Sequence, residues 1–315
     1  MRKLSVIAFG GNALLQKGQV GTIDEQEQNV YETCQHLLPL LKAGHDIVIG
    51  HGNGPQVGNV MLQHEAGKRL YGLPVMPMDV CVAETQGSIG FMIEQQMRNV
   101  MAEHGLKRNI VALITQAMVN KDDPAFKNPN KPVGPFYSKD EVDEILKVNP
   151  EWVFHEDPRK RGFRRVVASP LPIGIPNWEA VERLARNGTI VITVGGGGIA
   201  AYTDDKGKMI GIDAVIDKDL ACSMLANNIQ ADEFCIMTDV PNVYINFHQP
   251  GEQKLGRISV EEIKKHLADG QFTEGSMAPK VRACIDFVEK GGKEALITQA
   301  DQLGVKGAGT VIVHH

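Results

Sequence analysis

Short apolar runs alternate with amphipathic stretches along most of this chain. The apolar runs predict buried strands at residues 4–9, 46–49, 109–114, 189–194, 233–238, 295–298 and 310–313. Apolar residues at helical spacing predict helices at residues 22–44, 80–103, 177–186 and 218–228, with two more that begin near 259 and 277. This alternation predicts an α/β fold, in which a mainly parallel sheet carries helices on both faces.

Polar residues mark where several of these helices begin. A Ser or Thr followed three residues later by Glu is the sequence of a capping box, and it occurs at Thr22 with Glu25, Ser138 with Glu141 and Ser259 with Glu262. Asn177 is expected to cap the helix that follows it, and Pro55 suits the first turn of a further helix. Gly44 marks the end of the helix that starts at Thr22.

Residues 120–172 interrupt the alternation. The segment is rich in Pro, Asn, Lys and Arg, and we interpret it as an inserted subdomain or lid. Its run at 159–165 holds five basic residues in seven, from Arg159 to Arg165, which leaves a nucleic-acid patch open. Because a turn and a short apolar run adjoin these residues, an exposed hairpin on the lid is the better interpretation.

Glycine-rich loops follow three of the predicted strands, at residues 10–12, 50–58 and 195–198. Glycine exposes backbone N–H groups without a side chain in the way, and a following helix adds a dipole that favours anions. Strands of a parallel sheet end at one edge, so we expect the first two loops to converge there on an anionic ligand. His51, inside the second loop, is expected to pack or to form a hydrogen bond.

Two familiar nucleotide motifs do not explain these loops. The chain has no Gly-x-x-x-x-Gly-Lys-Ser/Thr sequence, which excludes a P-loop. Gly195, Gly197 and Ala200 have the spacing of a loose dinucleotide fingerprint, but that motif requires a helix to open there. The sequence instead continues to a turn at residues 204–207, which disfavours a dinucleotide site.

Composition narrows the class of protein. A length of 315 residues suits two lobes or one large α/β domain, and a formal net charge of -5 argues against a nucleic-acid binder. The five cysteines are scattered without a Cys-x-x-Cys pair, so we expect reduced, buried thiols and a cytoplasmic location. The apolar start is too short for a signal peptide or a membrane span, and we expect no membrane partner.

Three lysines stand out from the surface lysines that most proteins carry. Lys218 lies between Asp217 and Asp219 at an apolar helix start, where two carboxylates can hold an ammonium group in place. Lys280 lies where a helix begins, and Lys131 lies in the insertion. Phosphoryl transfer needs this kind of chemistry, because catalysis there is mainly positioning and neutralisation of charge.

Six stretches together resemble carbamate kinases, of the amino-acid kinase superfamily. They read AFGGNALL, HGNGPQVG, FKNPNKPVGPF, VIDKDLA, TDVPNVYIN and GSMAPK, and they span the chain almost from end to end. The resemblance implies a three-layer αβα sandwich with a central, mostly parallel eight-stranded sheet, an inserted lid and a homodimer. It implies a carbamate-binding lobe at 1–217 and a nucleotide-binding lobe at 218–315.

The resemblance also implies the reaction ATP + carbamate ⇌ ADP + carbamoyl phosphate, with Mg²⁺ on the nucleotide and no metal site of the protein's own. Such enzymes commonly run towards ATP, as the last step of the arginine deiminase pathway. Superfamily relatives often place a lysine just before the first Gly-Gly pair. Here Ala8 and Phe9 stand there, as in the carbamate kinase branch, and Lys131 is the candidate for the missing charge.

The resemblance assigns roles to residues of this chain. The phosphoryl oxygens would be bound by Gly10, Gly11 and Asn12, and the carbamoyl end by Gly52, Asn53 and Gly54. The catalytic residues would be Lys131, Lys218, Asp219 and Lys280. The nucleotide would be bound by Gly195, Gly196, Thr238, Asp239, Tyr244, Met277 and Lys280. Two rivals stay open, namely a kinase that phosphorylates an amino-acid carboxylate and a non-catalytic metabolite sensor on the same scaffold.

Overall fold

An eight-stranded sheet forms the centre of the molecule in the computed structural model, which describes residues 2–16, 18–157 and 160–315, without the side chain of Asn12. In spatial order its strands are β15 (Arg257–Ser259), β17 (Thr310–Val313), β16 (Glu294–Gln299), β12 (Glu233–Thr238), β1 (Leu4–Phe9), β2 (Asp46–His51), β9 (Ile190–Thr193) and β3 (Ile110–Ala112). Only the β16–β17 pairing is antiparallel among these neighbours. The sheet is therefore mostly parallel, as expected.

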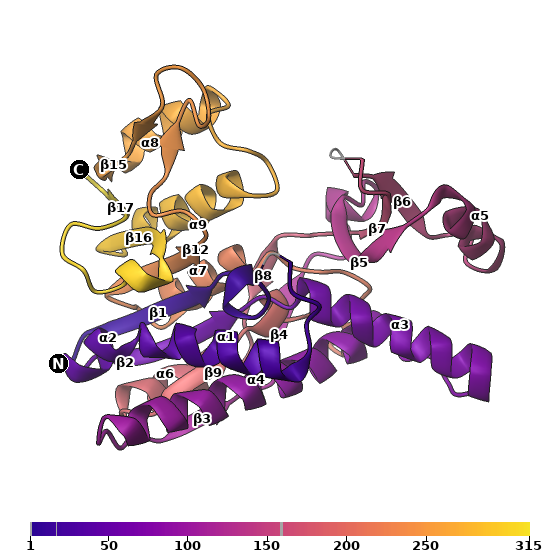
Figure 1. Cartoon of the computed structure of the whole chain (residues 1–315), viewed down its shortest axis with the longest axis horizontal. Coiled ribbons are helices and arrows are strands. Elements are labelled where there is room, and N and C mark those ends of the chain that lie inside the picture. Colours follow the sequence, from indigo (N-terminus) through magenta and orange to yellow (C-terminus); the bar gives the residue numbers. More distant parts are fainter. Residues whose placement is uncertain (1, 17, 158–159) are drawn as a thin grey trace.

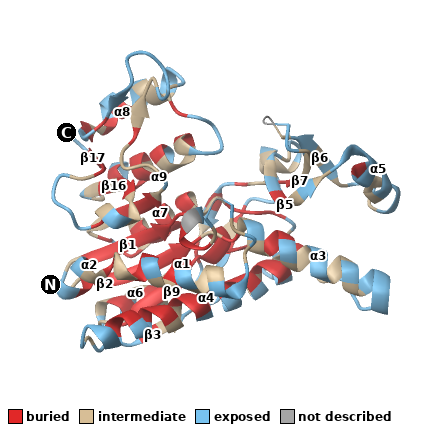
Figure 2. Cartoon of the chain, in the orientation of Figure 1, coloured by how far each residue is buried: buried red, intermediate tan, exposed pale blue. Residues whose placement is uncertain are grey.

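Helices cover both faces of this sheet and make three layers (Figure 1). One face packs on α6 (Trp178–Arg186), α7 (Lys218–Asn228), α8 (Val260–Ala268) and α9 (Met277–Glu289). The other packs on α1 (Ile23–Gln35), α2 (Leu38–Lys42) and α4 (Met78–Glu103). Alternate residues of the strands enter the two cores, with Val48 on the first face and Ile47 and Ile49 on the second. Figure 2 shows these strands as the buried centre of the molecule. The expected α/β sandwich is confirmed.

A second sheet lies beside the first and carries the insertion. Its strands, in order, are β11 (Met209–Gly211), β10 (Ile199–Thr203), β4 (Gln116–Val119) and β8 (Pro172–Gly174). The predicted turn at residues 204–207 joins β10 to β11. Between β4 and β8 the chain forms a separate three-stranded sheet of β5 (Lys131–Tyr137), β7 (Phe163–Val167) and β6 (Val153–Glu156), with α5 (Lys139–Val148). These elements project from the body beside α3 (Gly54–Tyr71), as a lid would (Figure 1).

The basic run lies where the lid was expected to form a hairpin. Strands β6 and β7 pair antiparallel, with Glu156 opposite Phe163. Lys160 and Arg161 are exposed in the connection between them. Arg159 lies outside the described residues. The short hairpin of β13 (Tyr244–Ile245) and β14 (Gln253–Lys254) lies in the C-terminal third, and one-turn 3₁₀ helices occupy Gly11–Ala13, Pro124–Phe126, Gly195–Gly197 and Ala300–Gln302.

Two of the three predicted capping boxes formed in full and the third in part, but one predicted helix did not form as a single helix. Thr22 and Ser138 each make both bonds of the box, and Ser259 accepts from the backbone N–H of Glu262. The single helix expected over 22–44 was wrong, because the structure breaks it into α1 and α2. Pro39 lies in the first turn of α2, and a proline ring clashes with the carbonyl four residues earlier, at Gln35, where α1 ends.

Asn177 occupies the N-cap position of α6 without capping it. Its side-chain amide instead donates to the backbone oxygen of Ile114, at 3.5 Å. The expected thiol chemistry is confirmed, since all five cysteines are buried and free. Across the described residues, no helix is long and apolar enough to cross a bilayer.

Candidate active site

The three glycine loops end adjacent strands of the main sheet. Strand β1 pairs with β2 through Phe9 opposite His51, and β2 pairs with β9 through Gly50 opposite Thr193. Because all three strands run parallel, Gly10, Gly52 and Gly195 follow them at the same edge. The predicted convergence is therefore present, although the three loops differ in what they contact.

The first loop borders a cavity of about 680 Å³. Gly10 lies so close to β12 that a β-carbon on it would come within 2.5 Å of the backbone oxygen of Met237, so only glycine fits there. Gly11 has open space on the corresponding side. The cavity is also lined by Thr238 and Lys280, so the first loop shares it with residues from the C-terminal third of the chain.

The second loop leads into the N-terminus of α3. A β-carbon on Gly52 would lie 3.4 Å from the Cδ atom of Lys218, so the loop backbone and this lysine are in contact range. Asn53 is 3 % exposed, and its side-chain amide donates to Thr85 Oγ1 at 2.9 Å. Gly54 opens α3, whose first turn has backbone N–H groups free of intrahelical partners. An anion is favoured at such an end by these donors and by the helix dipole.

The third loop lies behind the second. Gly195 and Gly196 are buried, and β-carbons on them would come within 2.5 Å of His51 Nε2 and 2.3 Å of Asn53 Nδ2. Neither glycine borders the cavity that Thr238 lines. Gly195 and Gly196 were expected to bind the nucleotide. The structure instead packs them against the second loop, which was expected to hold the carbamoyl group.

One carboxylate joins two of the singled-out lysines. Asp219 lies in the first turn of α7, and its Oδ1 is 2.5 Å from Lys218 Nζ. Its Oδ2 is 3.0 Å from the Nζ of Lys280, which the first turn of α9 supplies. The Asp219 side chain is 4 % exposed, and those of the two lysines are 14 % and 17 % exposed. Two ammonium groups are therefore fixed side by side with a single compensating charge.

Burial and ion pairing act in opposite directions on these groups. Burial alone lowers the pKa of Lys218, but the carboxylate of Asp219 outweighs it, and the pKa is raised above its ordinary value. Burial alone raises the pKa of Asp219, but Lys218 and Lys280 lower it well below the ordinary range. At neutral pH Asp219 is ionised and Lys218 is charged. This pairing suits a site that must receive an anion.

The lid supplies a third ammonium group to the same helix end. Lys131 Nζ is 2.9 Å from Asp217 Oδ2. The other oxygen of Asp217 caps α7 by accepting from the backbone N–H of Asp219, at 2.9 Å. Three lysines from far apart in the sequence thus meet at the N-terminus of α7.

His51 supports the second loop, as expected from the sequence. Its side chain is buried, and Nδ1 donates to the backbone oxygen of Gly52 at 2.9 Å. Burial and, to a smaller extent, the nearby charge of Lys218 lower its pKa to about 4 against the opposing bond to Gly52, so the imidazole is neutral at pH 7. With Nδ1 as the donor, His51 holds the loop backbone beside the lysine cluster.

Gln86, which the sequence pattern did not single out, ties the third glycine loop to the segment between β3 and β4. From the buried side of α4, its amide bonds both the N–H and the oxygen of Thr115, at 2.7 and 3.0 Å, and the oxygen of Gly195 at 2.8 Å. The available signal was its position on the apolar face of the predicted helix at 80–103. A glutamine there must find partners for its amide.

The remaining nucleotide candidates lie in the C-terminal third of the chain. Thr238 ends β12, Asp239 follows it, and both line the cavity. Met277 begins α9 directly after Gly275 and Ser276, which also line it. Tyr244 stands on the β13–β14 hairpin, stacked 5.5 Å from the ring of Phe247. The side chain of Asn12 lies outside the described residues.

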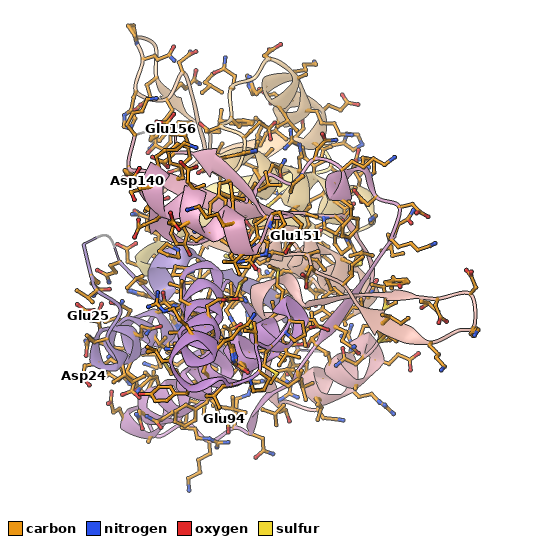
Figure 3. All side chains as sticks on the ribbon, turned by 90° about the vertical axis from the view of Figure 1, so that its right-hand side faces the viewer. Asp24, Glu25, Glu94, Asp140, Glu151 and Glu156 are labelled. Atoms are coloured by element: carbon orange, nitrogen blue, oxygen red, sulfur yellow. The ribbon has the colours of Figure 1, made fainter. Side chains whose placement is uncertain are left out.

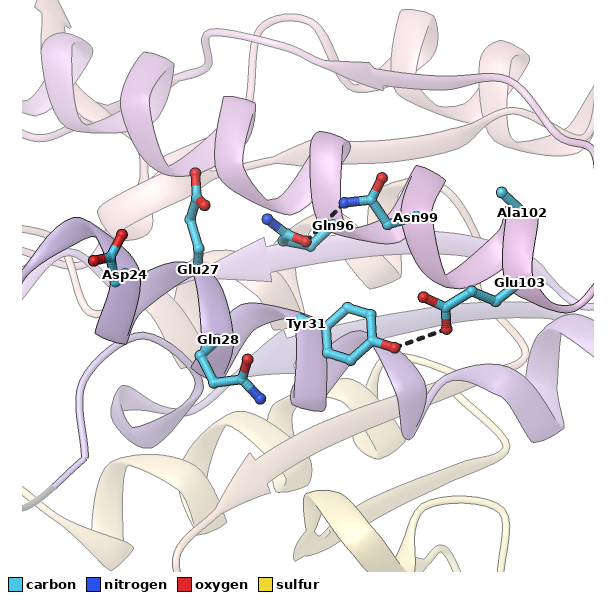
Figure 4. A pocket seen from close by; sticks show the side chains of 8 residues that line it. All are labelled: Asp24, Glu27, Gln28, Tyr31, Gln96, Asn99, Ala102 and Glu103. Carbon is cyan, nitrogen blue, oxygen red and sulfur yellow. Dashed lines mark hydrogen bonds between the residues drawn. The ribbon is translucent and has the colours of Figure 1, made fainter.

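A second cavity, of about 590 Å³, does not suit an anionic substrate. It lies between α1 and α4, where the hydroxyl of Tyr31 donates to Glu103 at 2.7 Å (Figure 4). Its described lining contains Asp24, Glu27 and Glu103 but no Lys, Arg or His. Acidic side chains also project from α1, α4 and the lid in Figure 3. Part of the negative charge of the protein is thus carried on these elements.

Comparison with known proteins agrees with this geometry. The model of the amino acid kinase family matches residues 3–299. The chain is 45% identical to a carbamate kinase of Lentilactobacillus hilgardii, over 99% of this chain and 98% of that protein. It is 46% identical to a carbamate kinase of Thermococcus kodakarensis, over 95% of each. A structure of Giardia lamblia carbamate kinase bound to AMP-PNP superposes with a TM-score of 0.92 at 42% identity, covering 99% of this chain and 98% of that one. The chain therefore belongs to the amino acid kinase family of phosphotransferases, and within it to the carbamate kinases.

Proposed function

We propose that this chain catalyses the reversible reaction ATP + carbamate ⇌ ADP + carbamoyl phosphate. The observation that carries the proposal is the Lys218–Asp219–Lys280 cluster at the edge where the first two glycine loops end. The reaction transfers a phosphoryl group between two anions, so it needs fixed positive charge and close backbone donors rather than a nucleophilic side chain. The carbamate kinase relatives support the same reaction.

In the direction of ATP synthesis, a terminal oxygen of the ADP β-phosphate attacks the phosphorus of carbamoyl phosphate. The bond from phosphorus to the carbamoyl oxygen breaks, and carbamate leaves with that electron pair. Lys218 and Lys280 neutralise the charge of the moving phosphoryl group, and Asp219 orients both lysines. The backbone N–H groups of Gly10 and Gly11 donate to the phosphoryl oxygens, together with Asn12. Lys131 adds a further positive charge from the lid.

Carbamate is small, planar and anionic, so it is best held by backbone that can approach closely. We place its carboxylate at Gly52, Asn53 and Gly54, where α3 begins. We place ADP or ATP on the C-terminal lobe, along Thr238, Asp239, Tyr244, Met277 and Lys280. The buried positions of Gly195 and Gly196 favour a role in shaping the carbamate loop over contact with the nucleotide.

We propose that Mg²⁺ enters on the nucleotide. Mg²⁺ is usually held by phosphate oxygens, waters and one or two carboxylates, and it supplies further charge neutralisation when bound. Within the described residues, no three His, Cys, Asp or Glu side chains gather as a metal site. Asp239 lines the cavity and offers a carboxylate on the nucleotide side.

The resemblance to carbamate kinases extends the proposal to cellular context and assembly. We propose that the enzyme runs towards ATP at the end of arginine deiminase-type catabolism, in the cytoplasm. The five free thiols suit that reducing compartment. We also propose a homodimer. Phe91 on α4 and Ile173 on β8 are 56% and 63% exposed, and a second copy would cover exposed apolar side chains of this kind.

The test is ATP formation from ADP, Mg²⁺ and carbamoyl phosphate, with acetyl phosphate as the comparison donor. Fast synthesis that is selective for carbamoyl phosphate supports the reaction and the substrate together. ADP binding without ATP formation from either donor would contradict it. That outcome would favour a kinase acting on another carboxylate, or a sensor. The four charged residues of the cluster and lid argue against a sensor, which does not need them all.

A further inference from the structure

The lid and the body touch through two glycine backbones. A β-carbon on Gly58 of α3 would lie 2.2 Å from the Cα and 2.5 Å from the backbone N of Gly134 in β5. Both atoms belong to main chain, which cannot turn aside as the end of a flexible side chain can. The approach therefore depends on the missing side chain at Gly58.

Both partners of this contact are held in place. Val133 in β5 and Val167 in β7 are buried in one apolar cluster with Val57 of α3. The base of the lid is thus packed on the same helix that carries Gly58. An added methyl group would have to displace this packed strand, because neither side has free space.

Gly134 is also fixed from within the lid. It has a φ of +71°, which glycine adopts without strain. The guanidinium of Arg164 donates to its backbone oxygen through Nε at 3.1 Å and Nη2 at 2.7 Å. The same guanidinium lies 5.4 Å from the ring centre of Phe136. Gly134 is therefore clamped between α3 and Arg164.

The clamped residue is three positions from Lys131 on the same strand. Lys131 pairs with Val167 and Val133 with Arg165, so this part of β5 is a regular ladder that moves as a unit. The ladder's register shifts beyond Val133, at the clamp itself. Gly134 is covalently joined to Val133, the last residue of that ladder before the shift. A displacement at Gly134 is therefore passed through Val133 along the ladder to Lys131, whose Nζ lies 2.9 Å from Asp217.

We propose that Gly58 is a positioning residue for phosphoryl transfer. Its backbone contact with Gly134 sets how far the lid strand carries Lys131 towards the N-terminus of α7. The inference rests on the proposed function, in which Lys131 contributes charge to the moving phosphoryl group. Gly58 is not among the residues that the proposed function assigns to either substrate.

The experiment compares Gly58→Ala with Gly67→Ala, each in the wild-type and Lys131→Ala backgrounds. Gly67 is the matched control, because it lies in the same helix and an added methyl group would meet only Leu73 at an ordinary 3.5 Å. The readouts are kcat and KM for carbamoyl phosphate and for ADP. Circular dichroism checks that each variant is folded.

Gly58→Ala should lower kcat/KM for carbamoyl phosphate by about 10²-fold, the size expected for a misplacement of about 1 Å. The KM for ADP and the kinetics of Gly67→Ala should stay near wild type. In the Lys131→Ala background the same Gly58 change should cost less than about twofold, because the group it positions is gone. An equal loss in both backgrounds overturns the proposal.

Two further outcomes are distinguishable. If the wild-type enzyme forms no ATP from carbamoyl phosphate and ADP, the proposed function itself is contradicted, whatever the variants show. If Gly58→Ala does not fold, Arg164→Lys releases the clamp from the other side without changing charge, and it should show the same dependence on Lys131. Loss of activity in Arg164→Lys that is unchanged by Lys131→Ala also overturns the proposal.

Discussion

Asp219 determines the charge of the site, because its nearly buried carboxylate pairs with the ammonium groups of both Lys218 and Lys280. A single negative charge between two positive ones leaves a net positive charge facing the glycine loops. The site can therefore attract a phosphorylated ligand although the whole chain carries a formal charge of -5. Each lysine of the cluster is then worth testing alone.

Lys280→Ala should lower kcat by about 10²–10³-fold, the effect of removing one preorganised charge or donor from a transition state. The fold should stay intact, because Lys280 is bonded only to Asp219 among the described residues, and Asp219 retains Lys218. Steady-state kinetics measure this. Lys290→Ala is the control, as Lys290 caps the far end of the same helix and pairs with Asp286. Near-normal turnover in Lys280→Ala would remove that residue from the mechanism.

His51 should make stability depend on pH. Its folded pKa is about 4 and its ordinary value is 6.5, so between these values the unfolded chain binds a proton that the folded chain does not. Stability is then fully present above pH 6.5 and falls as the pH drops towards 4, by up to roughly 3 kcal/mol. Urea unfolding at several pH values measures this.

His51→Gln can still donate to Gly52 but cannot titrate, so its stability should vary less over the same pH window. His104→Gln, which alters an exposed histidine after α4, should keep the wild-type dependence. Equal slopes in wild type and His51→Gln would show that another group is responsible.

Local residue types allowed part of the site to be predicted. Lys218 could be found because two carboxylates flank it, and the glycine loops because each follows an apolar run. The position of Gly196 could not be found in this way. It lies against Asn53 only because β9 pairs with β2, and pairing between distant strands is a tertiary event that no local pattern encodes. The pairing of Lys280 with Asp219 has the same origin.

The sequence predicted whether a segment is a helix or a strand better than it predicted where each helix begins and ends. The capping boxes at Thr22 and Ser138 formed because a hydroxyl and a carboxylate three positions apart satisfy helix N–H groups locally. The break between α1 and α2 was missed, although Pro39 supplied the signal through its clash with the carbonyl of Gln35. Asn177 failed to cap because its backbone, at φ -103° and ψ 19°, is not in the extended conformation that N-cap residues usually adopt, so its Oδ1 accepts no N–H of the first turn.

The start of α7 does two tasks with one side chain. Asp217 caps the helix with Oδ1 and holds the lid lysine with Oδ2. Asp217→Asn keeps a good N-cap but removes the charge facing Lys131, so stability should change little while kcat/KM falls about tenfold, the equivalent of one charge-assisted hydrogen bond. Asp217→Ala should lose the same activity and also about 1 kcal/mol of stability.

Thermal unfolding and steady-state kinetics of the two variants separate these tasks. The difference in stability between the two variants isolates the cap, because both remove the ion pair with Lys131 and only Asp217→Ala removes the cap. If Asp217→Asn is as unstable as Asp217→Ala, the cap contributes nothing. If Asp217→Asn retains full kcat/KM, the ion pair with Lys131 does not serve the reaction.

The lid projects from a well-packed body. The two are joined by the apolar cluster at the base of the lid and by the ion pair between Lys131 and Asp217. The body buries most of its apolar residues on the two faces of the main sheet, whereas Lys139, Lys147 and Arg161 of the lid are exposed (Figure 2). Segments with few buried contacts open at low free-energy cost. Ligands that draw the lid down should therefore change its exposure first.

Carbamoyl phosphate, added without ADP so that no turnover occurs, should slow tryptic cleavage within residues 120–172 while leaving cleavage elsewhere unchanged. The reason is that a bound phosphoryl group attracts Lys131, and proteolysis follows the population of the open lid when opening is fast. Mass spectrometry of the fragments over time measures the rate at Lys139, Lys147 and Arg161. In Lys131→Ala the ligand should protect less, because the lid has lost the charge that draws it down. Equal cleavage rates with and without carbamoyl phosphate in the wild-type enzyme would mean that the lid does not close on this substrate.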